Sequence, residues 1–253
     1  MKCIILAAGY ATRLYPLTEN FPKPLLEVKG KSIMNWLIED IEKIDLIDQI
    51  IVVSNHKFIK QFEKWKKNLE GQGLYKKNLK IEIIDDGSTN NENRLGAVKD
   101  IAYAIQKCGI KDDILVLAGD NLLDFSIKGF VDFFTEKKKT CIMRHFEDSI
   151  EKLQRTGVIE IDSDGKVLSM QEKPKEPKSQ WAVPPFYIYS KDSLDKIILG
   201  VESGEVNVDA PGGFIEWFCR QNIVYAYEMP GRRYDIGDYE SYKQIDNCYV
   251  KGN

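Results

Sequence analysis

The sequence contains little histidine and no clustered cysteine, and both features narrow the chemistry open to it. His56 and His145 are its two histidines, too few and too isolated for a histidine-based metal site or a catalytic triad. The five cysteines are scattered, and no two of them form a CxxC pair. We therefore expect neither a zinc site nor a disulfide framework, and free thiols in a reducing cytoplasm are the simplest interpretation.

Long apolar runs and an excess of positive charge are also missing. No apolar run approaches the ~20 residues that a membrane-spanning helix requires. Met1 and Lys2 lead directly into an expected strand, so we expect no signal peptide and a cytoplasmic location. A net charge of −3 gives no reason to expect a nucleic-acid or membrane partner.

The sequence lacks the two most common phosphate-binding motifs, the P-loop with its GKS or GKT ending and the GxGxxG loop. Instead, LAAGYATRLYPLTENFPK (residues 6–23) follows a short apolar run typical of a buried strand. Gly9 can take a positive φ or present its N–H without obstruction. Arg13 and Lys23, the latter between two prolines, place two cations on a stiff loop. This combination suits a polyphosphate, and an ordinary surface loop with solvated charges is the alternative.

Apolar strands alternate with amphipathic helices in the first part of the chain. We expect strands at 2–6, 49–53, 79–84 and 113–118, helices at 33–44, 57–69 and 95–107, and a loop at 71–78. This alternation predicts an α/β fold, Rossmann-like, with a mostly parallel sheet and helices on both faces. Ligands bind at the carboxyl ends of the strands in such sheets, where Gly9, Arg13 and Asp120 fall.

The pattern changes after Gly157. An antiparallel hairpin is expected over 157–172, followed by a strand at 186–189, a helix at 190–199, a strand at 223–228 and a helix at 239–248. Because no segment rich in proline, glycine or serine separates the two parts, we expect one domain covering residues 1–253. Its second half would form an antiparallel portion folded over the sheet.

Asp120 directly follows the apolar strand sequence LVLAG. A carboxylate at the mouth of a buried strand is a natural ligand for a hard cation such as Mg²⁺. The alternative is an aspartate that caps a helix or a turn.

The loop at residues 6–25 resembles a family signature. LAAG, TRL, PLT and PKPL occur in it at fixed spacing and resemble the signature of the nucleotidyltransferases that make nucleoside-diphosphate sugars, which have a GT-A-like fold. The resemblance implies that Leu6, Ala8 and Gly9 bind the nucleotide. Arg13 would then hold the departing pyrophosphate, and Lys23 would hold the α-phosphate as negative charge builds.

Three further stretches resemble parts of this family. RYDIG around Asp235 resembles its late metal-binding stretch, which implies that Asp120 and Asp235 hold Mg²⁺. Asp238 lies close by, and the sequence does not decide between Asp235 and Asp238. Gly96 resembles a base-contacting segment, although NRL precedes it where the sugar enzymes usually have GTA. We expect it to bind the nucleotide.

The third stretch, QEKP at residues 171–174, resembles the EKP motif of the family. By this resemblance Lys173 grips the phosphate of the acceptor, Glu172 meets the acceptor, and Gly157 lines its pocket. A solvated charge pair at a strand end is the alternative interpretation of Glu172 and Lys173.

These residues together imply transfer of a nucleoside monophosphate from a nucleoside triphosphate to a small phosphomonoester, with release of pyrophosphate. CTP is the favoured donor, and UTP and dTTP remain open. The acceptor is either a sugar 1-phosphate or a non-sugar phosphate such as phosphocholine or phosphoglutamine. Pro184 and Pro185 lack the N–H groups that sugar hydroxyls would require.

Two other functional classes and one partner stay open. A nucleotide-binding regulatory module is disfavoured because all the expected site residues occur together. A GT-A glycosyltransferase would have a DxD motif, which the sequence GDN at residues 119–121 lacks. A second copy of the chain, in a homo-oligomer, remains open as a partner.

Overall fold

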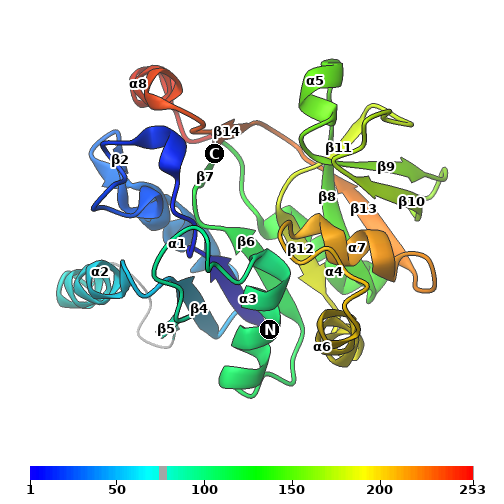
Figure 1. Cartoon of the computed structure of the whole chain (residues 1–253), viewed down its shortest axis with the longest axis horizontal. Helices are drawn as coiled ribbons and strands as arrows, with labels where there is room; N and C mark the ends of the chain where they lie inside the picture. The colour runs from blue at the N-terminus through cyan, green and yellow to red at the C-terminus, as the bar shows by residue number, and fades with distance from the viewer. Residues whose placement is uncertain (74–78, 253) are drawn as a thin grey trace. The chain divides into compact units, whose positions relative to one another are not determined.

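The computed structural model describes residues 1–73 and 79–252, so part of the loop expected at 71–78 lies outside the described residues. The chain divides into two compact units, coloured along the sequence in Figure 1. Unit 1 consists of Met1–Arg94, Ala118–Lys128 and Pro230–Asn253, and unit 2 consists of Leu95–Leu117 and Gly129–Met229. One domain over the whole chain stays a prediction.

Unit 1 contains three parallel strands with β4 in the middle. They are β1 (Lys2–Leu6), β4 (Gln49–Ser54) and β5 (Lys80–Asp85). Leu6 pairs with Val53 and Ser54 pairs with Asp85, so the loops that follow these strands leave along one edge. Ile4, Ile5 and the apolar residues of β4 are fully buried, which explains why their apolar runs predicted strands.

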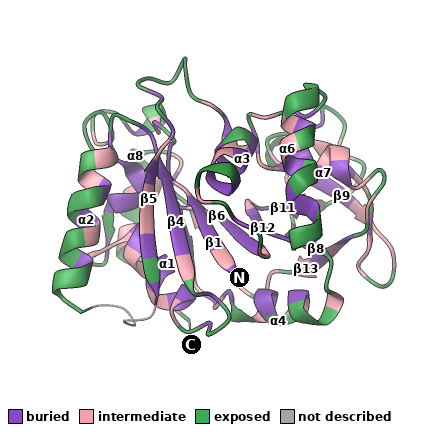
Figure 2. Ribbon diagram, turned by 90° about the horizontal axis from the view of Figure 1, so that it is seen from below, coloured by how far each residue is buried: buried purple, intermediate pink, exposed green. Residues whose placement is uncertain are grey.

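Helices and short strands complete unit 1. They are α1 (Ile33–Ile41), α2 (Ile59–Gly71), α8 (Tyr239–Cys248), β2 (Glu27–Val28), β3 (Lys31–Ser32), β7 (Asn121–Leu123) and β14 (Arg233–Asp235). Ser32 caps α1, as its side-chain oxygen accepts a hydrogen bond from the Asn35 N–H at 3.1 Å. Figure 2 shows β4 buried and α2 exposed along one side, in keeping with the amphipathic pattern of that helix.

The sequence did not predict the antiparallel pair of β7 and β14. Each strand has three residues, which is too short to show a hydrophobic period. Asp235 pairs with Asn121, so this pair brings the segment after β6 next to a segment more than a hundred positions away. A core cluster that includes Leu122, Ile236 and Tyr249 holds the pair in place.

Unit 2 contains a mixed sheet in which the strands follow the order β10-β9-β11-β8-β12-β6, and β13 also pairs with β8. The strands are β6 (Ile114–Ala118, its last residue in unit 1), β8 (Thr140–Phe146), β9 (Gly157–Ile161), β10 (Val167–Glu172), β11 (Trp181–Val183), β12 (Phe186–Tyr189) and β13 (Val224–Glu228). The helices are α3 (Ala97–Lys107), α4 (Lys128–Lys137, its first residue in unit 1), α5 (Ile150–Leu153), α6 (Leu194–Ser203) and α7 (Gly212–Phe218).

The α/β class and the antiparallel second half are confirmed, because β9 and β10 form the expected hairpin. The helix expected at 190–199 begins later, since a 3₁₀ turn occupies Lys191–Ser193 before α6. No helix within the described residues is long and apolar enough to cross a bilayer.

Asn55 connects three parts of unit 1 directly after β4. It is fully buried, at 0% exposure. Its side-chain N–H donates to the Ala8 carbonyl at 2.9 Å, and its side-chain oxygen accepts from the Phe58 N–H at 2.9 Å. The amide therefore ties the loop after β1 to the start of α2.

We expect Asn55→Asp to lower the free energy of unfolding by about 1–3 kcal/mol, because a carboxylate cannot donate to the buried Ala8 carbonyl. The matched control is Asn20→Asp at an exposed position, which should stay within about 0.5 kcal/mol of the unmodified protein. Urea titrations followed by circular dichroism give both values. Equal stabilities for the two variants would contradict this role of Asn55.

Candidate functional site

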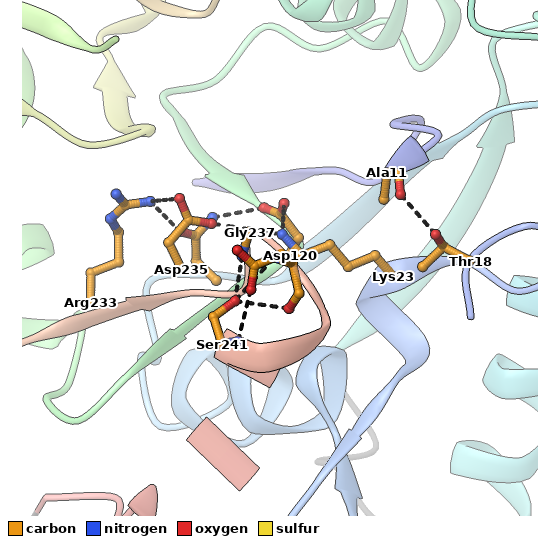
Figure 3. A network of polar contacts seen from close by, with 10 residues as sticks. Ala11, Thr18, Lys23, Asp120, Arg233, Asp235, Gly237 and Ser241 are labelled. Atoms are coloured by element: carbon orange, nitrogen blue, oxygen red, sulfur yellow. Dashed lines mark hydrogen bonds and ion pairs between the residues drawn. The ribbon is translucent and has the colours of Figure 1, made fainter. Parts of the chain in front are cut away.

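The loop after β1 is anchored on both sides of its glycine. Ala7 donates to the Val53 carbonyl at 2.9 Å, and Thr18 donates its hydroxyl to the Ala11 carbonyl at 2.8 Å (Figure 3). Gly9 is exposed, and a Cβ added to it would meet nothing within 4 Å. The left-handed residue of the loop is Ala11, with φ 45°, and not Gly9. The open space around Gly9 thus leaves its backbone accessible. Of the two reasons for a glycine given above, an unobstructed N–H therefore fits better than a positive φ.

Leu6, Ala8 and Arg13 lie on the same segment of unit 1. Leu6 ends β1, and Ala8 is buried with its carbonyl bound by Asn55. Arg13 is exposed in the 3₁₀ turn Thr12–Leu14. Its charge contributes to a lowered pKa of Asp238, after the larger effect of the hydrogen bonds from Ser241.

Lys23 is a buried cation between two carboxylates that are more exposed than it is. It begins the 3₁₀ turn Lys23–Leu25, and its side chain is only 8% exposed. Its Nζ lies 2.6 Å from Oδ2 of Asp120 and 3.7 Å from Oδ1 of Asp235 (Figure 3). One ammonium therefore contacts both carboxylates that the sequence assigned to a metal.

Two residues that the sequence analysis missed hold Asp120 from its other side. Asn121 donates to Oδ1 of Asp120 at 2.8 Å, and Arg233 donates to Oδ1 of Asn121 at 2.7 Å. Arg233 also lies 3.7 Å from Asp235. Burial alone would raise the pKa of Asp120, but the charge and hydrogen bond of Lys23, with Arg233, hold it below its ordinary value.

A sequence signal for Arg233 did exist. Residues two positions apart on a strand point to the same face, so a strand ending at Asp235 places Arg233 beside that carboxylate. The signal for Asn121 was its position next to Asp120.

The structure separates the two late aspartates by what they bind. Asp238 caps α8, because its Oδ1 accepts from the Ser241 N–H at 2.8 Å in a capping box. Asp235 instead faces the ammonium of Lys23. The geometry thus favours Asp235 over Asp238 as the partner of Asp120.

The pair of Asp120 and Asp235 fits a hard divalent cation. Both carboxylates already contact one cation, the Lys23 ammonium, which marks a position that two oxygen donors share. No group of three or more His, Cys, Asp or Glu suited to a metal occurs in the described part of the chain. Mg²⁺ commonly takes one or two protein carboxylates and completes its shell with water and phosphate oxygens. The remaining ligands would have to come from such sources.

A second polar cluster lies at the ends of β4 and β5. His56, one of the two histidines, has an exposed ring that contacts Asp85 at 2.6 Å. Ser88 donates to Asp86, and the hydroxyl of Tyr10 donates to Ser88 at 3.3 Å. Burial raises the pKa of Asp86, while the hydrogen bonds from Ser88 oppose that shift. Tyr10 thus links this cluster to the loop after β1.

The residues assigned to the acceptor come together in unit 2. Gly157 and Glu172 pair across β9 and β10, and Lys173 follows with its N–H bound to the Thr156 carbonyl at 3.1 Å. A Cβ on Gly157 would lie 3.2 Å from Oε2 of Glu172, and one on Gly212 only 2.0 Å from it. The carboxylate of Glu172 therefore packs on two glycines.

The environment of Glu172 disfavours its charge. Burial raises its pKa to about 7, Lys173 opposes this shift, and the carboxylates of Glu216 and Asp209 add to it. Glu172 is thus a carboxyl group whose pKa is raised into the neutral range. A raised pKa of this kind is common at functional sites.

Gly96 has a structural explanation of its own. It precedes α3 with φ 94°, and a Cβ there would lie 2.6 Å from the Val208 carbonyl oxygen. The N–H groups of Ala97 and Val98 donate to the carbonyls of Asp209 and Val208, so they are occupied within unit 2. Packing thus accounts for the glycine, and its role in nucleotide binding stays a prediction.

Known proteins are similar to this chain over most of its length. A model of the family described as nucleotidyl transferase matches residues 2–252. A bifunctional protein GlmU from Methanococcus maripaludis strain C7 is 35% identical over 94% of this chain and 51% of its own length. A glucose-1-phosphate adenylyltransferase from Fervidobacterium nodosum is 27% identical over 94% of this chain and 59% of its own length.

Solved structures share the fold. A UDP-glucose pyrophosphorylase in complex with UDP-glucose matches with a TM-score of 0.79, at 20% identity and 97% coverage of both chains. A UTP-bound enzyme of the same type from Acinetobacter baumannii matches with a TM-score of 0.77, at 16% identity over 97% of this chain and 92% of that one.

The chain spans about half the length of the GlmU relatives that it matches. The family match, in contrast, runs from β1 to beyond α8 and includes every residue assigned to the site. The chain therefore belongs to the nucleotidyl transferase family.

Proposed function

We propose that the chain transfers a nucleoside monophosphate from a nucleoside triphosphate to a small phosphomonoester and releases pyrophosphate. The observation that carries this proposal is the buried Lys23 ammonium between Asp120 and Asp235. Lys23 lies on the segment that follows β1, as does the accessible Gly9, in a member of this family. Both features support phosphate chemistry in unit 1.

The reaction needs no general base. A phosphate oxygen of the acceptor forms a bond to the α-phosphorus of the triphosphate, and the bond from that phosphorus to the bridging oxygen breaks. The electron pair of that bond leaves with pyrophosphate. Because a phosphate dianion is a nucleophile at neutral pH, catalysis consists of positioning and charge neutralisation.

Each charged residue has a proposed part in this step. Arg13 binds the departing pyrophosphate, Lys23 stabilises charge on the α-phosphate, and Lys173 binds the phosphate of the acceptor. Asp120 and Asp235 would hold Mg²⁺, which when bound would neutralise further charge on the nucleotide phosphates. Leu6, Ala8 and Gly9 position the nucleotide through the backbone of the loop.

The proposal also concerns the nucleobase of the donor triphosphate. CTP remains our preferred donor, with UTP and dTTP as alternatives. One relative named above is a glucose-1-phosphate adenylyltransferase, and two of the solved structures contain UDP-glucose and UTP. ATP therefore joins these three nucleotides in the test.

Two observations bear on the acceptor. The names of relatives refer to glucose 1-phosphate and UDP-glucose, which supports a sugar 1-phosphate. Pro184 and Pro185 precede β12 without N–H donors, and the Val183 carbonyl is bound by Thr156 at 3.0 Å. A non-sugar phosphate such as phosphocholine or phosphoglutamine therefore stays in the proposal as the second acceptor class. We also propose that the protein is cytoplasmic and forms a homo-oligomer.

We expect Asp120→Asn and Asp235→Asn to reduce turnover by at least a hundredfold with the fold intact, because each removes one carboxylate charge. Asp238→Asn is the matched control, since asparagine also caps helices well. Pyrophosphate release is measured for each NTP against sugar 1-phosphates, phosphocholine and amino-acid phosphates at varied Mg²⁺. Loss of turnover in the Asp238 variant alone would overturn the assignment to Asp235. Absence of release for every pair would overturn the proposed function.

We expect glucose 1-phosphate to be a poorer acceptor than a smaller or non-sugar phosphate, because the Pro184–Pro185 segment offers no backbone donor to sugar hydroxyls. Lys173→Ala should lower kcat/KM for every acceptor, since each one brings a phosphate. Lys175→Ala, at an exposed position on the same segment, is the control. A hundredfold preference for glucose 1-phosphate would refute the proline argument and leave the sugar acceptor in place.

The raised pKa of Glu172 predicts a pH-dependent stability. Between its ordinary 4.5 and about 7 the carboxyl is protonated in the folded protein and ionised in the unfolded chain. Stability is therefore lost as the pH rises through this window, by up to about 3 kcal/mol, and the loss is complete above pH 7. Glu172→Gln should lack this loss, whereas Glu176→Gln, which is exposed, should retain it. Urea titrations from pH 5 to 8 measure the difference, and parallel pH profiles for all three proteins would contradict the prediction.

A further inference from the structure

Lys23 occupies the position at which Asp120 and Asp235 would hold a divalent cation. Its Nζ is within 2.6 Å of one carboxylate and 3.7 Å of the other, with the side chain 8% exposed. The ammonium donates a hydrogen bond to Oδ2 of Asp120, so this carboxylate oxygen is occupied by the lysine. The ammonium and a divalent cation cannot both be accommodated there, because their like charges would be adjacent.

We propose that Lys23 is a built-in counter-ion that competes with the divalent cation for Asp120 and Asp235 in the nucleotide-free protein. This inference rests on the proposed function for its choice of metal ligands. The ammonium keeps the two carboxylates neutralised and close together before substrate arrives. The lysine side chain is long and flexible, so a phosphate group that enters beside it provides a second anionic partner to which it can move.

The surroundings of the carboxylates suit such an exchange. The Asn121 amide holds Oδ1 of Asp120 at 2.8 Å, and Arg233 holds that amide at 2.7 Å. These contacts do not involve the ammonium, so Asp120 keeps its orientation when Lys23 leaves Oδ2. Arg233 also lies 3.7 Å from Asp235, on the oxygen that Lys23 does not contact. Asn121 and Arg233 can thus keep Asp120 and Asp235 in place whether the lysine ammonium or a divalent cation lies between them.

Competition of this kind has a thermodynamic consequence. The nucleotide-free protein should bind divalent cations weakly, because binding must displace an ion pair that is already formed. Removal of the ammonium should strengthen metal binding, although it removes a positive charge that the reaction uses. Most substitutions in a metal site weaken metal binding, so the sign of the effect is diagnostic.

The test is Mn²⁺ binding to the full chain without nucleotide, followed by electron paramagnetic resonance of free Mn²⁺. We expect Lys23→Met to bind Mn²⁺ at least tenfold more tightly than the unmodified protein. Lys23→Arg keeps the cation and should bind as weakly as the unmodified protein. Lys60→Met, on the exposed side of α2, controls for the loss of one positive charge and should leave the affinity unchanged.

An unchanged or weaker affinity in Lys23→Met would overturn the proposal. If that variant does not fold, Lys23→Gln replaces it, since its amide still donates to Asp120 without a charge. Thermal unfolding with and without MgCl₂ gives a second measure, and Mg²⁺ should raise the Tm of the uncharged variant more than that of the unmodified protein. Neither measurement uses a nucleotide or turnover, so their outcome is independent of whether the chain transfers any nucleotide.

Discussion

The burial of one ammonium group is the constraint on which the candidate site depends. Removal of a lysine charge from water is costly, and the cost is offset only where good partners surround it. Lys23, Asp120 and Asp235 come from three separate segments of unit 1. Because the buried ammonium alone would be unfavourable in its place, its contacts with the two carboxylates link the three segments. The same argument gives Asn121 and Arg233 their importance, since they fix the carboxylate that receives the ammonium.

Unit 2 shows the opposite electrostatic situation. The carboxyl of Glu172 packs on Gly157 and Gly212, with Asp209 and Glu216 near enough to disfavour its ionisation. The proximity of Lys173 opposes these effects without cancelling them. Unit 1 thus pairs Asp120 and Asp235 with a buried ammonium, whereas unit 2 presents a carboxyl group whose charge depends on the pH. An acceptor that donates a hydrogen bond would suit the second arrangement.

Much of the fold could be predicted from the sequence, because β1, β4 and β6 are largely buried and appear as apolar runs. β7 and β14 could not, since three residues carry no period and their pairing depends on tertiary packing. For the site, Lys23, Asp120 and Asp235 were named from the sequence, but their mutual contact was not. Gly96 also has a packing explanation that its motif did not indicate, since a Cβ there would lie 2.6 Å from the Val208 carbonyl oxygen. The choice between Asp235 and Asp238 also needed a structure, because either aspartate could cap a helix.

The pairing of β14 with β7 has a consequence for the synthesis of the protein. Unit 1 begins with the first strand of the chain, yet it is completed by Arg233–Asp235 and by the aromatic contacts of Tyr249 with Trp36 and Tyr234. A ribosome that has made only the first two hundred or so residues therefore exposes an incomplete unit 1. Until the last segment emerges, Lys23 lacks one of its two carboxylates, and the apolar surface around Leu122 has no cover. Unit 2, whose segments end at Met229, can finish folding on the ribosome before the unit that began first.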